Sequence, residues 1–577
     1  HVQANFAGGT KTHTDSDTPT HTHPHTHIGM FKPISLVGPT EADHRSTERL
    51  MELLRSNNSF EPPEESAKRE EVLAKLDTIV KEVVLKICVD QGVSDQTVGS
   101  SARIFTFGSY RLGVHSSGAD IDVLCVAPRH VDRHSFFTEL EIALRAQPLV
   151  KELSIVPEAY VPITKMKFDS VSIDMVYARL PFSAIDEDLD ILDEANLVGV
   201  DEPTQRALNG PRVANEILKL VPNVDNFRIT LRVIKLWSKN RGVYTNALGF
   251  WGGVALAVLT ARVCQLYPNA SPNMLVRRFF RAYEQWKWPT PIKLCETEHK
   301  NLEFRVWDPQ INPENLRDQM PIITPVYPAM NTTYNVSKTT RYVIQAEVVR
   351  GATMSQEADD GQRPWSDLVA DGLPEFWEST RHFLRIEICS DSEDIHTKWC
   401  GTMEARLRFL IQNLELVEGM YVRPWPYSFP VPEGSRGHPY ATLFFFALLK
   451  PAKRAAQSST AHVDLSKPVL QFLTRLQDRG EVLEGMFGPF INPVKRSNLP
   501  DFVFPGGRPV STKKRRKKSM TSNGDSLDDP PKKRLHLEDQ EDVVELEASS
   551  STTSGNAGPS NPPLGTTKKP KISLGDA

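Results

Sequence analysis

The sequence predicts an α+β fold of several domains: a sheet-containing unit near the N-terminus, a helical middle unit and a small α/β unit toward the C-terminus. The chain has 577 residues, more than one hydrophobic core holds, and a prior of about 150 residues per domain gives three or four units. Apolar strand-like runs occur up to residue 180, and helical spacing follows an acidic, strand-poor stretch at residues 186–201. A strand, a helix and a strand follow again after residue 380.

The sequence of residues 1–93 predicts a tail followed by helices. Residues 1–30 hold histidines among Thr and Pro, which favours a disordered tail over adventitious metal binding. From Ser46 to Val93, apolar residues recur at helical spacing and are expected to pack on the predicted sheet, with the segment 31–66 also packing on the middle unit. Because the chain begins at His1 without a signal-peptide pattern, we interpret it as trimmed or as a fragment.

Composition excludes several classes of protein. The six cysteines form no CxxC motif and stand mostly in apolar runs, which is typical of buried free thiols in a reducing compartment. The most apolar run, Leu248 to Ala261, has the length of a core helix and not of a bilayer crossing. The formal net charge is −4, so any nucleic acid would bind through a local basic cleft and not through the overall field.

The most informative stretch places two carboxylates on one strand after a Gly-Ser turn. Gly108-Ser109 follows an apolar strand and leaves backbone N–H groups and a hydroxyl free to hold phosphate oxygens. Asp120 and Asp122 then open a second apolar strand, where side chains two residues apart point to the same side. Unpaired carboxylates there would be costly, so the pair indicates hard divalent cations. An acidic turn without chemistry is the minor alternative.

A third carboxylate stands in a similar setting. Val171 to Tyr177 alternates as a strand and carries a lone Asp174 in apolar company. On its own Asp174 would more often end a strand or form a salt bridge, so its assignment depends on the first pair. A Gly-Ser turn followed by Asp-x-Asp is typical of nucleotidyltransferases, in which a metal pair roughly 3.5–4 Å apart activates an attacking oxygen and stabilises a leaving one.

Longer motifs give a closer resemblance. The segment from Phe107 to Arg133 resembles eukaryotic nuclear poly(A) polymerases, continuously from about residue 30 to 345 and more loosely to 505. The same resemblance is carried by Leu208-Asn209-Gly210, Val221-Pro222-Asn223, Ile234-Lys235-Leu236-Trp237, Leu248-Gly249-Phe250, Cys264-Gln265-Leu266-Tyr267-Pro268-Asn269-Ala270 and Thr333-Tyr334-Asn335-Val336-Ser337.

The resemblance implies the domain types. It implies a polymerase β-like nucleotidyltransferase domain at 67–182, a helical middle domain at 183–360 and an RRM-like RNA-binding domain at 361–505. The last domain has no basic-glycine-aromatic RNP1 strand. We therefore interpret its Phe444–Phe446 triplet as core, and expect any RNA contact there to use backbone charge and not base stacking.

The resemblance also implies the activity. It is template-independent addition of AMP from ATP to the 3′-hydroxyl of RNA, as in mRNA 3′-end polyadenylation, with release of pyrophosphate. Asp120, Asp122 and Asp174 would hold two Mg²⁺ ions, with Mn²⁺ as a substitute. The expected partners are ATP, an RNA 3′ end and the cleavage and polyadenylation machinery, and the chain is expected to be a nuclear monomer without a membrane segment.

The nucleotide contacts come from the resemblance, apart from the three acids and the Gly-Ser turn. A helix from Phe227 to Lys239 carries four basic residues on one face, which we interpret as a solvated face, except that Lys235 would neutralise the triphosphate. Lys165 and Asn246 would contact the RNA end or the nucleotide, and Ser116 replaces the family's usual threonine. The ATP contacts would be Phe107, Gly108, Ser109, Ser116, Asp120, Ile121, Asp122, Asp174, Asn209, Lys235, Tyr244, Gly253 and Val254.

The C-terminal segment 506–577 is rich in Ser, Pro, Gly and charge and is expected to be disordered. Its basic clusters at 513–518 and 532–534 would bind a nuclear import receptor, or alternatively RNA as a nonspecific arm. Two rival functions stay open. One is a terminal transferase that adds uridine or a CCA end, and the other is a binding scaffold with an inactive transferase fold, against which the intact acids argue.

Overall fold

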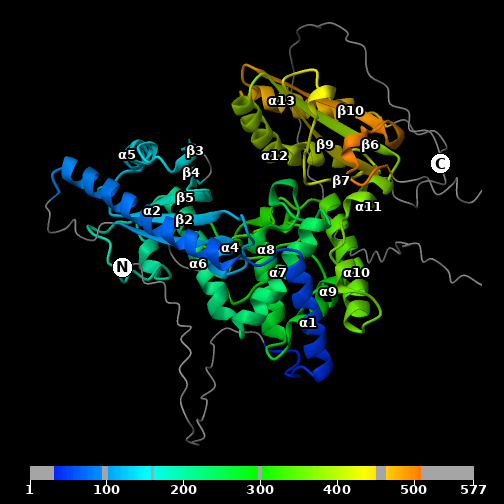
Figure 1. Cartoon of the computed structure of the whole chain (residues 1–577), viewed down its shortest axis with the longest axis horizontal. Coiled ribbons are helices and arrows are strands. Elements are labelled where there is room, and N and C mark those ends of the chain that lie inside the picture. Colours follow the sequence, from blue (N-terminus) through cyan, green and yellow to red (C-terminus); the bar gives the residue numbers. More distant parts are fainter. Residues whose placement is uncertain (1–31, 94–101, 158–160, 297–301, 450–462, 509–577) are drawn as a thin grey trace, which may run out of the picture.

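The computed structural model of the chain describes residues 32–93, 102–157, 161–296, 302–449 and 463–508. Within these ranges the chain forms a first sheet with its helices, a set of middle helices and a second sheet with its helices, found at the left, the lower centre and the upper right of Figure 1. The predicted multidomain mixture of helices and sheets is confirmed. The two predicted disordered tails, including both basic clusters, lie outside the described residues apart from 506–508.

The first sheet has five strands in the order β1-β2-β5-β4-β3. β2 and β5 run parallel, whereas the other neighbouring pairs are antiparallel. One face packs against α2 and α5, and the other packs against α6 and the segments around it. The elements are α2 (Pro63–Asp90), β1 (Arg103–Phe107), α4 (Gly108–Leu112), β2 (Ile121–Ala127), α5 (Arg133–Arg145), β3 (Val150–Val156), β4 (Ile163–Phe168), β5 (Val171–Arg179) and α6 (Glu202–Leu220).

Helix α1 (Glu41–Ser56) lies against the middle helices and not against the first sheet. It begins at a capping box formed by Thr40 and Asp43. Ser46 Oγ donates a hydrogen bond of 2.7 Å to Asp359 Oδ1, and the buried leucines of α1 join the core of the middle helices. The expectation that these leucines pack on the sheet is therefore wrong, because helical spacing identifies a buried face but not the surface that buries it.

The middle helices surround an aromatic core. The Trp237 and Phe280 rings meet edge to face, with centroids 4.8 Å apart. Gly351 permits this packing, because a Cβ there would lie 2.3 Å from a Phe280 ring carbon. The elements are α7 (Val224–Asn240), α8 (Gly253–Leu266), α9 (Pro272–Glu284) and α10 (Lys338–Asp359), with 3-10 turns at Glu194–Leu197, Asn246–Leu248, Pro313–Arg317 and Trp365–Asp367.

The second sheet is antiparallel, in the order β10-β6-β9-β7 with β8 paired to β9. α12 and α13 cover one face, while α11 and the segment near residue 503 cover the other. The elements are α11 (Leu373–Glu378), β6 (His382–Ser390), α12 (Glu393–Glu415), β7 (Tyr421–Pro424), β8 (Phe429–Pro430), β9 (Tyr440–Leu449), α13 (Ser466–Asp478) and β10 (Met486–Lys495), with 3-10 turns at Glu433–Ser435, Arg496–Asn498 and Asp501–Val503.

Two further predictions are confirmed by burial. Phe444, Phe445 and Phe446 are at most 2% exposed, so the triplet belongs to the core and offers no open stacking surface. All six cysteines are free thiols, and four of them are buried. Among the described residues, no helix combines the length and the apolar character that a membrane crossing needs.

Candidate active site

The structure brings the three predicted acids together. Because β2 and β5 are parallel neighbours, Asp122 lies directly opposite Asp174 in the register. Asp120 precedes β2 by one residue and is exposed. One carboxylate oxygen from each acid lies within 4.8 Å of the others. Strand periodicity and sheet register thus place three anionic oxygen donors around one point in space.

The negative charge of Asp122 is not fully balanced by the protein. Burial, together with repulsion from Asp120 and Asp174, raises the pKa of Asp122 to about 7. The positive charges of Lys165 and Lys235 oppose this shift without cancelling it. Hard divalent cations take carboxylate oxygens as ligands. The donor set and the repulsion between its members therefore fit a site that can bind divalent metal ions.

Lys165 lies beside the triad on the neighbouring strand. It is opposite Asp174 in the register of β4 and β5, and its Nζ lies 2.5 Å from Asp174 Oδ2. Half of the lysine side chain is exposed, 54% against 21% for Asp174. This ammonium is thus a mobile cation at the edge of the acids, within reach of whatever binds there.

The Gly-Ser turn closes on the same acids. Gly108 has a φ of +59° and begins α4, and a Cβ at this position would lie 2.0 Å from Asp122 Oδ2. Only glycine therefore allows the turn to approach the carboxylate so closely. Ser109 follows within α4, and Phe107 precedes the turn and packs against Gly210 of α6, where a Cβ would lie 2.7 Å from its ring.

The basic face of α7 binds the segment that follows this turn. Arg228 Nε donates to Leu112 O at 3.0 Å, and Arg232 donates to Gly113 O at 2.8 Å and to His115 O at 2.6 Å. The carbonyls of Leu112 and Gly113 lie where α4 ends, at the left-handed Gly113, so the helix leaves them unpaired, and His115 follows two residues later. The predicted solvated face is therefore wrong for Arg228 and Arg232, which hold the segment leading to Ser116.

Lys235 occupies the same face one turn before the exposed Lys239. Its Nζ donates to Val114 O at 3.1 Å. Burial, together with the nearby Lys239 and Arg232, lowers the pKa of Lys235 to about 8, while Asp120 and Asp122 act in the opposite direction. Lys235 therefore faces the acids from the helical side, as a partly desolvated cation opposite Asp120 and Asp122.

The turn after α7 supplies the remaining predicted contacts. Burial and then the charges of Asp120 and Asp122 raise the pKa of Tyr244, which places its hydroxyl on the side of the acids. A Cβ at Gly253 would lie 3.3 Å from that hydroxyl, so the start of α8 approaches it closely. Thr245, between Tyr244 and the 3-10 turn, has a φ of +136°, a strained conformation for a β-branched residue.

For the remaining predicted residues the structure gives burial and unpaired atoms, but no side-chain hydrogen bond to the acids. Ile121 is fully buried in the core beneath the sheet, so its side chain points away from the acids. Val254 is 43% exposed at the first turn of α8. In the described part of the chain, Asn209 Oδ1 and Asn246 Oδ1 are buried acceptors without a hydrogen-bond partner. The Nδ2 of Asn209 does have a partner, Met330 Sδ at 3.5 Å. Buried amide oxygens without partners are uncommon and favour a ligand at this place.

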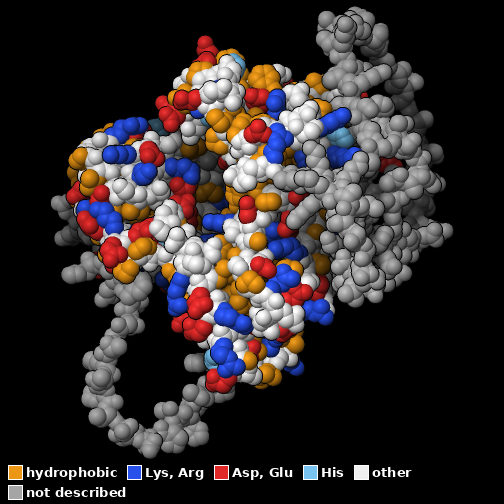
Figure 2. Space-filling view, turned by 45° about the vertical axis from the view of Figure 1, so that its right-hand side comes forward, with side chains coloured by type: hydrophobic (Ala, Val, Ile, Leu, Met, Phe, Trp, Pro, Cys, Tyr) orange, Lys and Arg blue, Asp and Glu red, His pale blue; other side chains and the backbone are white. Residues whose placement is uncertain are grey.

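Sequence reasoning missed the part that Arg228, Arg232 and Thr245 play around the site. The basic spacing on α7 was the available signal for the two arginines, whereas no local pattern marks Thr245. In Figure 2 the surface is hollowed between the lobe at the left of the view and the rest of the molecule, and acidic and basic side chains both border the hollow.

Comparison with known proteins agrees with this geometry. Residues 29–221 match the family model described as the poly(A) polymerase nucleotidyltransferase domain, residues 226–371 match the poly(A) polymerase central domain, and residues 375–437 match the poly(A) polymerase predicted RNA binding domain. A crystal structure of the Cid1 poly(U) polymerase is also similar, at 14% identity and a TM-score of 0.40, over 57% of this chain and 100% of that one.

Two relatives are similar over most of the chain. The poly(A) polymerase of Dictyostelium discoideum is 40% identical over 92% of this chain and 66% of its own length. Nuclear poly(A) polymerase 1 of Arabidopsis thaliana is 43% identical over 84% of this chain and 68% of its own length. The match thus spans about two thirds of the length of these relatives. The chain belongs to the poly(A) polymerase family.

Proposed function

We propose that this protein is a template-independent polynucleotide adenylyltransferase, which adds AMP from ATP to the 3′-hydroxyl of RNA during mRNA 3′-end polyadenylation. The observation that carries the proposal is the convergence of Asp120, Asp122 and Asp174 beside the Gly108 turn. Membership in the poly(A) polymerase family supports it. The attacking 3′-oxygen forms a bond to the α-phosphorus of ATP, the bond to the β-phosphate oxygen breaks, and pyrophosphate leaves.

Asp120, Asp122 and Asp174 would hold two Mg²⁺ ions, with Mn²⁺ as a substitute. When bound, such ions make the 3′-hydroxyl more acidic and neutralise charge on the triphosphate and the departing pyrophosphate. The residues shape the site for this purpose. The Gly108 turn presents its backbone beside Asp122. Burial and then repulsion from the other two acids raise the pKa of Asp122, and bound cations would relieve the repulsion.

The opposite side of the triphosphate would be held by α7 and the turn that follows it. Lys235 is a part-buried cation facing the acids, and Tyr244 lies on the same side. Phe107, Ser109 and Ser116 flank this region on the first sheet and its loops. Phosphoryl transfer depends mainly on positioning and on neutralising charge, which is the work these residues are suited to.

The nucleoside and the RNA end would meet residues around α6 and α8. Gly253 and Val254 open α8, and Lys165 stands at the edge of the triad. The unpaired oxygens of Asn209 and Asn246 accept hydrogen bonds, and the exocyclic amine of adenine donates them. We assign these two amides to adenine recognition, because uracil offers a carbonyl at the corresponding edge and would leave both oxygens unpaired.

We place the protein in the nucleus, as the names of the Arabidopsis thaliana relatives suggest. The basic clusters at 513–518 and 532–534 would bind an import receptor, and the cleavage and polyadenylation machinery would recruit the enzyme. We keep the domain limits 67–182, 183–360 and 361–505 as predictions, together with a monomeric state.

Incubation of the protein with a short RNA, Mg²⁺ and one nucleotide at a time tests the proposal. We expect ATP to be incorporated and the other three nucleotides to be used poorly. Asp122→Asn should abolish incorporation, whereas Asp188→Asn, which changes an exposed acid with no role in the site, should not. Preferential use of UTP or CTP would identify a different terminal transferase. Inactivity of a folded, metal-bound wild-type protein on every nucleotide would identify a scaffold.

A further inference from the structure

A second cavity lies where the middle helices meet the C-terminal unit. It has a volume of about 340 Å³, within the range of roughly 300–1,000 Å³ that is common for ligand sites. Trp425, Tyr427 and Phe429 line it from the C-terminal unit, and Lys239 and Asn240 line it from the end of α7. Aromatic walls beside an exposed lysine are the features by which proteins hold unpaired nucleotides.

Tyr427 is the accessible aromatic wall of this cavity. It is 41% exposed, whereas Trp425 is 4% exposed and packs beneath it, with ring centroids 6.1 Å apart. Tyr427 OH donates a hydrogen bond of 3.0 Å to Lys239 O, which fixes the ring against the end of α7. The ring face is therefore held in one orientation, and it has free area on which a base can stack.

The two charged groups of the cavity, Lys239 and Asp371, indicate which kind of ligand it can bind. Lys239 offers an exposed ammonium that can pair with a phosphate, and Asp371 offers an exposed carboxylate that accepts hydrogen bonds. A carboxylate repels a free anion or an acidic peptide but accepts from the exocyclic amine of a base. Adenine carries such an amine and uracil does not, so the set fits an adenine whose phosphate lies toward Lys239.

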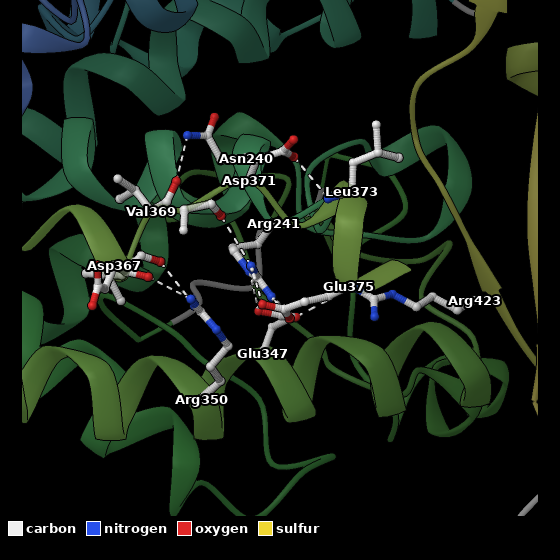
Figure 3. Close-up of polar contacts among 12 residues, drawn as sticks. Asn240, Arg241, Glu347, Arg350, Asp367, Val369, Asp371, Leu373, Glu375 and Arg423 are labelled. Carbon is white, nitrogen blue, oxygen red and sulfur yellow. Dashed lines mark hydrogen bonds and ion pairs between the residues drawn. The ribbon is translucent and has the colours of Figure 1, made fainter. Parts of the chain in front are cut away.

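The walls are fixed by an ion cluster around the buried Arg241, next to the cavity (Figure 3). Arg241 is fully buried, and its guanidinium binds both oxygens of Glu347 on α10, at 2.9 and 3.1 Å, and also binds Glu375 on α11. The main chain is joined here as well, because Gly372 N donates to Asn240 O at 2.9 Å. A preformed cavity binds its ligand at a lower entropic cost than one that must first be ordered.

The cavity and the acidic site share Lys239 and its neighbours on α7. Lys239 Nζ lies over the Tyr244 ring, 5.5 Å from its centroid, and Tyr244 faces the acids. Tyr427 OH donates to Lys239 O, so Lys239 lies between the two phenols, with its carbonyl on Tyr427 and its ammonium over Tyr244. Lys239 is four residues beyond Lys235 on α7, which is about 6 Å along the helix. A strand whose 3′ end reaches the acids can therefore place an upstream nucleotide in this cavity.

We propose that this cavity is a subsite for an unpaired adenine of the RNA strand, located upstream of the growing 3′ end, with the base stacked on Tyr427 and its amine directed to Asp371. The proposal rests on the proposed function, which supplies the RNA and makes its upstream residues adenines. It also changes one expectation from the sequence. Base stacking in the C-terminal unit would come from the segment between β7 and β8, and not from the sheet.

Binding of fluorescently labelled oligoadenylate and oligouridylate of matched lengths to the full chain without divalent metal tests the subsite. Tyr427→Ala should weaken binding of a long oligoadenylate about tenfold, because it removes one base–aromatic stack. The affinity of Tyr427→Phe should stay within about twofold of the wild type, because the ring remains. Tyr342→Ala, at 39% exposure on α10, is the matched control and should have no effect. Asp371→Asn should reduce the preference for oligoadenylate over oligouridylate.

Varying the primer length distinguishes the loss of one subsite from a general weakening of RNA binding. A trinucleotide that ends before the cavity should bind Tyr427→Ala as it binds the wild type, while long primers should not. In the metal-loaded protein, the variant should raise the KM for a long primer and leave the KM for ATP unchanged. Equal binding of long oligoadenylate by wild type and a folded Tyr427→Ala would overturn the subsite. Failure to incorporate any nucleotide would instead refute the proposed function, since the binding assay needs no turnover.

Discussion

The acidic triad and the Arg241 cluster both place carboxylates close together, but only one of them is balanced. At the junction between the middle helices and the C-terminal unit, Glu347 and Glu375 face Arg241, and Arg423 lies 3.6 Å from Glu347. Burial alone would raise the pKa of Glu375, yet hydrogen bonds to Arg241 lower it. Glu375 is therefore stabilised as an anion by the protein itself, without any added ligand.

The triad shows the opposite balance. Burial and two neighbouring acids raise the pKa of Asp122, and the nearest cations, Lys165 and Lys235, do not compensate. A cluster that the protein balances by itself holds domains together, whereas a cluster left unbalanced is prepared for charge that arrives from solution. The contrast between the two clusters supports a structural role for the Arg241 cluster and the catalytic role that we propose for the triad.

The largest effect is expected at the triad. Asp174→Asn keeps the size and shape of the side chain but removes an anionic donor opposite Asp122. Incorporation of AMP should fall on the order of 10³-fold, with the melting temperature retained. Rapid-quench assays of a single turnover measure the loss directly. A variant within about tenfold of the wild type would show that Asp174 is not part of the metal site.

The Arg241 cluster should respond in stability instead. Arg241→Met leaves the buried Glu347 with only the longer contact to Arg423, at 3.6 Å, and the free energy of unfolding should fall by about 3–5 kcal/mol. Chemical denaturation measures this, with Arg145→Met as the control, because Arg145 and Glu141 form an exposed pair expected to contribute less than about 1 kcal/mol. Equal stability of both variants would mean that the cluster is not a structural element.

The pH dependence of the metal-free protein sharpens the contrast. The pKa of Asp122 is about 7 in the folded state, against an ordinary value of 3.8. Between about pH 4 and pH 7, Asp122 therefore carries a proton in the folded state but not in the unfolded state. Stability from this group is therefore lost as the pH rises through that window. At pH 8 the free energy of unfolding of Asp122→Asn should exceed that of the wild type by about 1–3 kcal/mol, which corresponds to a pKa shift of about one to two units.

Thermal melting from pH 5 to pH 8 with a chelator present checks this prediction. The difference between Asp122→Asn and wild type should shrink toward pH 5, and addition of Mg²⁺ at pH 8 should stabilise the wild type and not the variant. A difference that grows toward low pH would contradict the assigned direction of the shift.

The smallest effect is expected at Lys165, which stands beside the triad as an internal cation. Lys165→Gln removes a half-exposed partner of Asp174, so stability should change by less than about 1 kcal/mol. Affinity for Mg²⁺ at pH 8 should rise about threefold, since an exposed pair of this kind contributes up to about 1 kcal/mol. Isothermal titration measures the affinity, and a weaker binding of Mg²⁺ would show that Lys165 supports the metal instead of competing with it.

The triad was predictable because its signals are local or periodic. Asp120 and Asp122 follow from strand alternation, and Gly108 follows from the turn before them. The role of Arg232 was not predictable, because basic residues at helical spacing look the same whether they meet water or the carbonyls of a loop. The Arg241 cluster could not be predicted, because Glu347 and Glu375 are 106 and 134 residues away from Arg241 in the sequence. Only the tertiary fold brings them together.

The central claim is that cations complete the charge of the triad and of no other described carboxylate cluster. Crystals soaked with Mn²⁺ and a non-hydrolysable ATP analogue test it by anomalous scattering. The account predicts manganese peaks bounded by Asp120, Asp122 and Asp174, and none beside Glu347 and Glu375. An empty triad next to a bound analogue, or manganese at the Arg241 cluster, would contradict it.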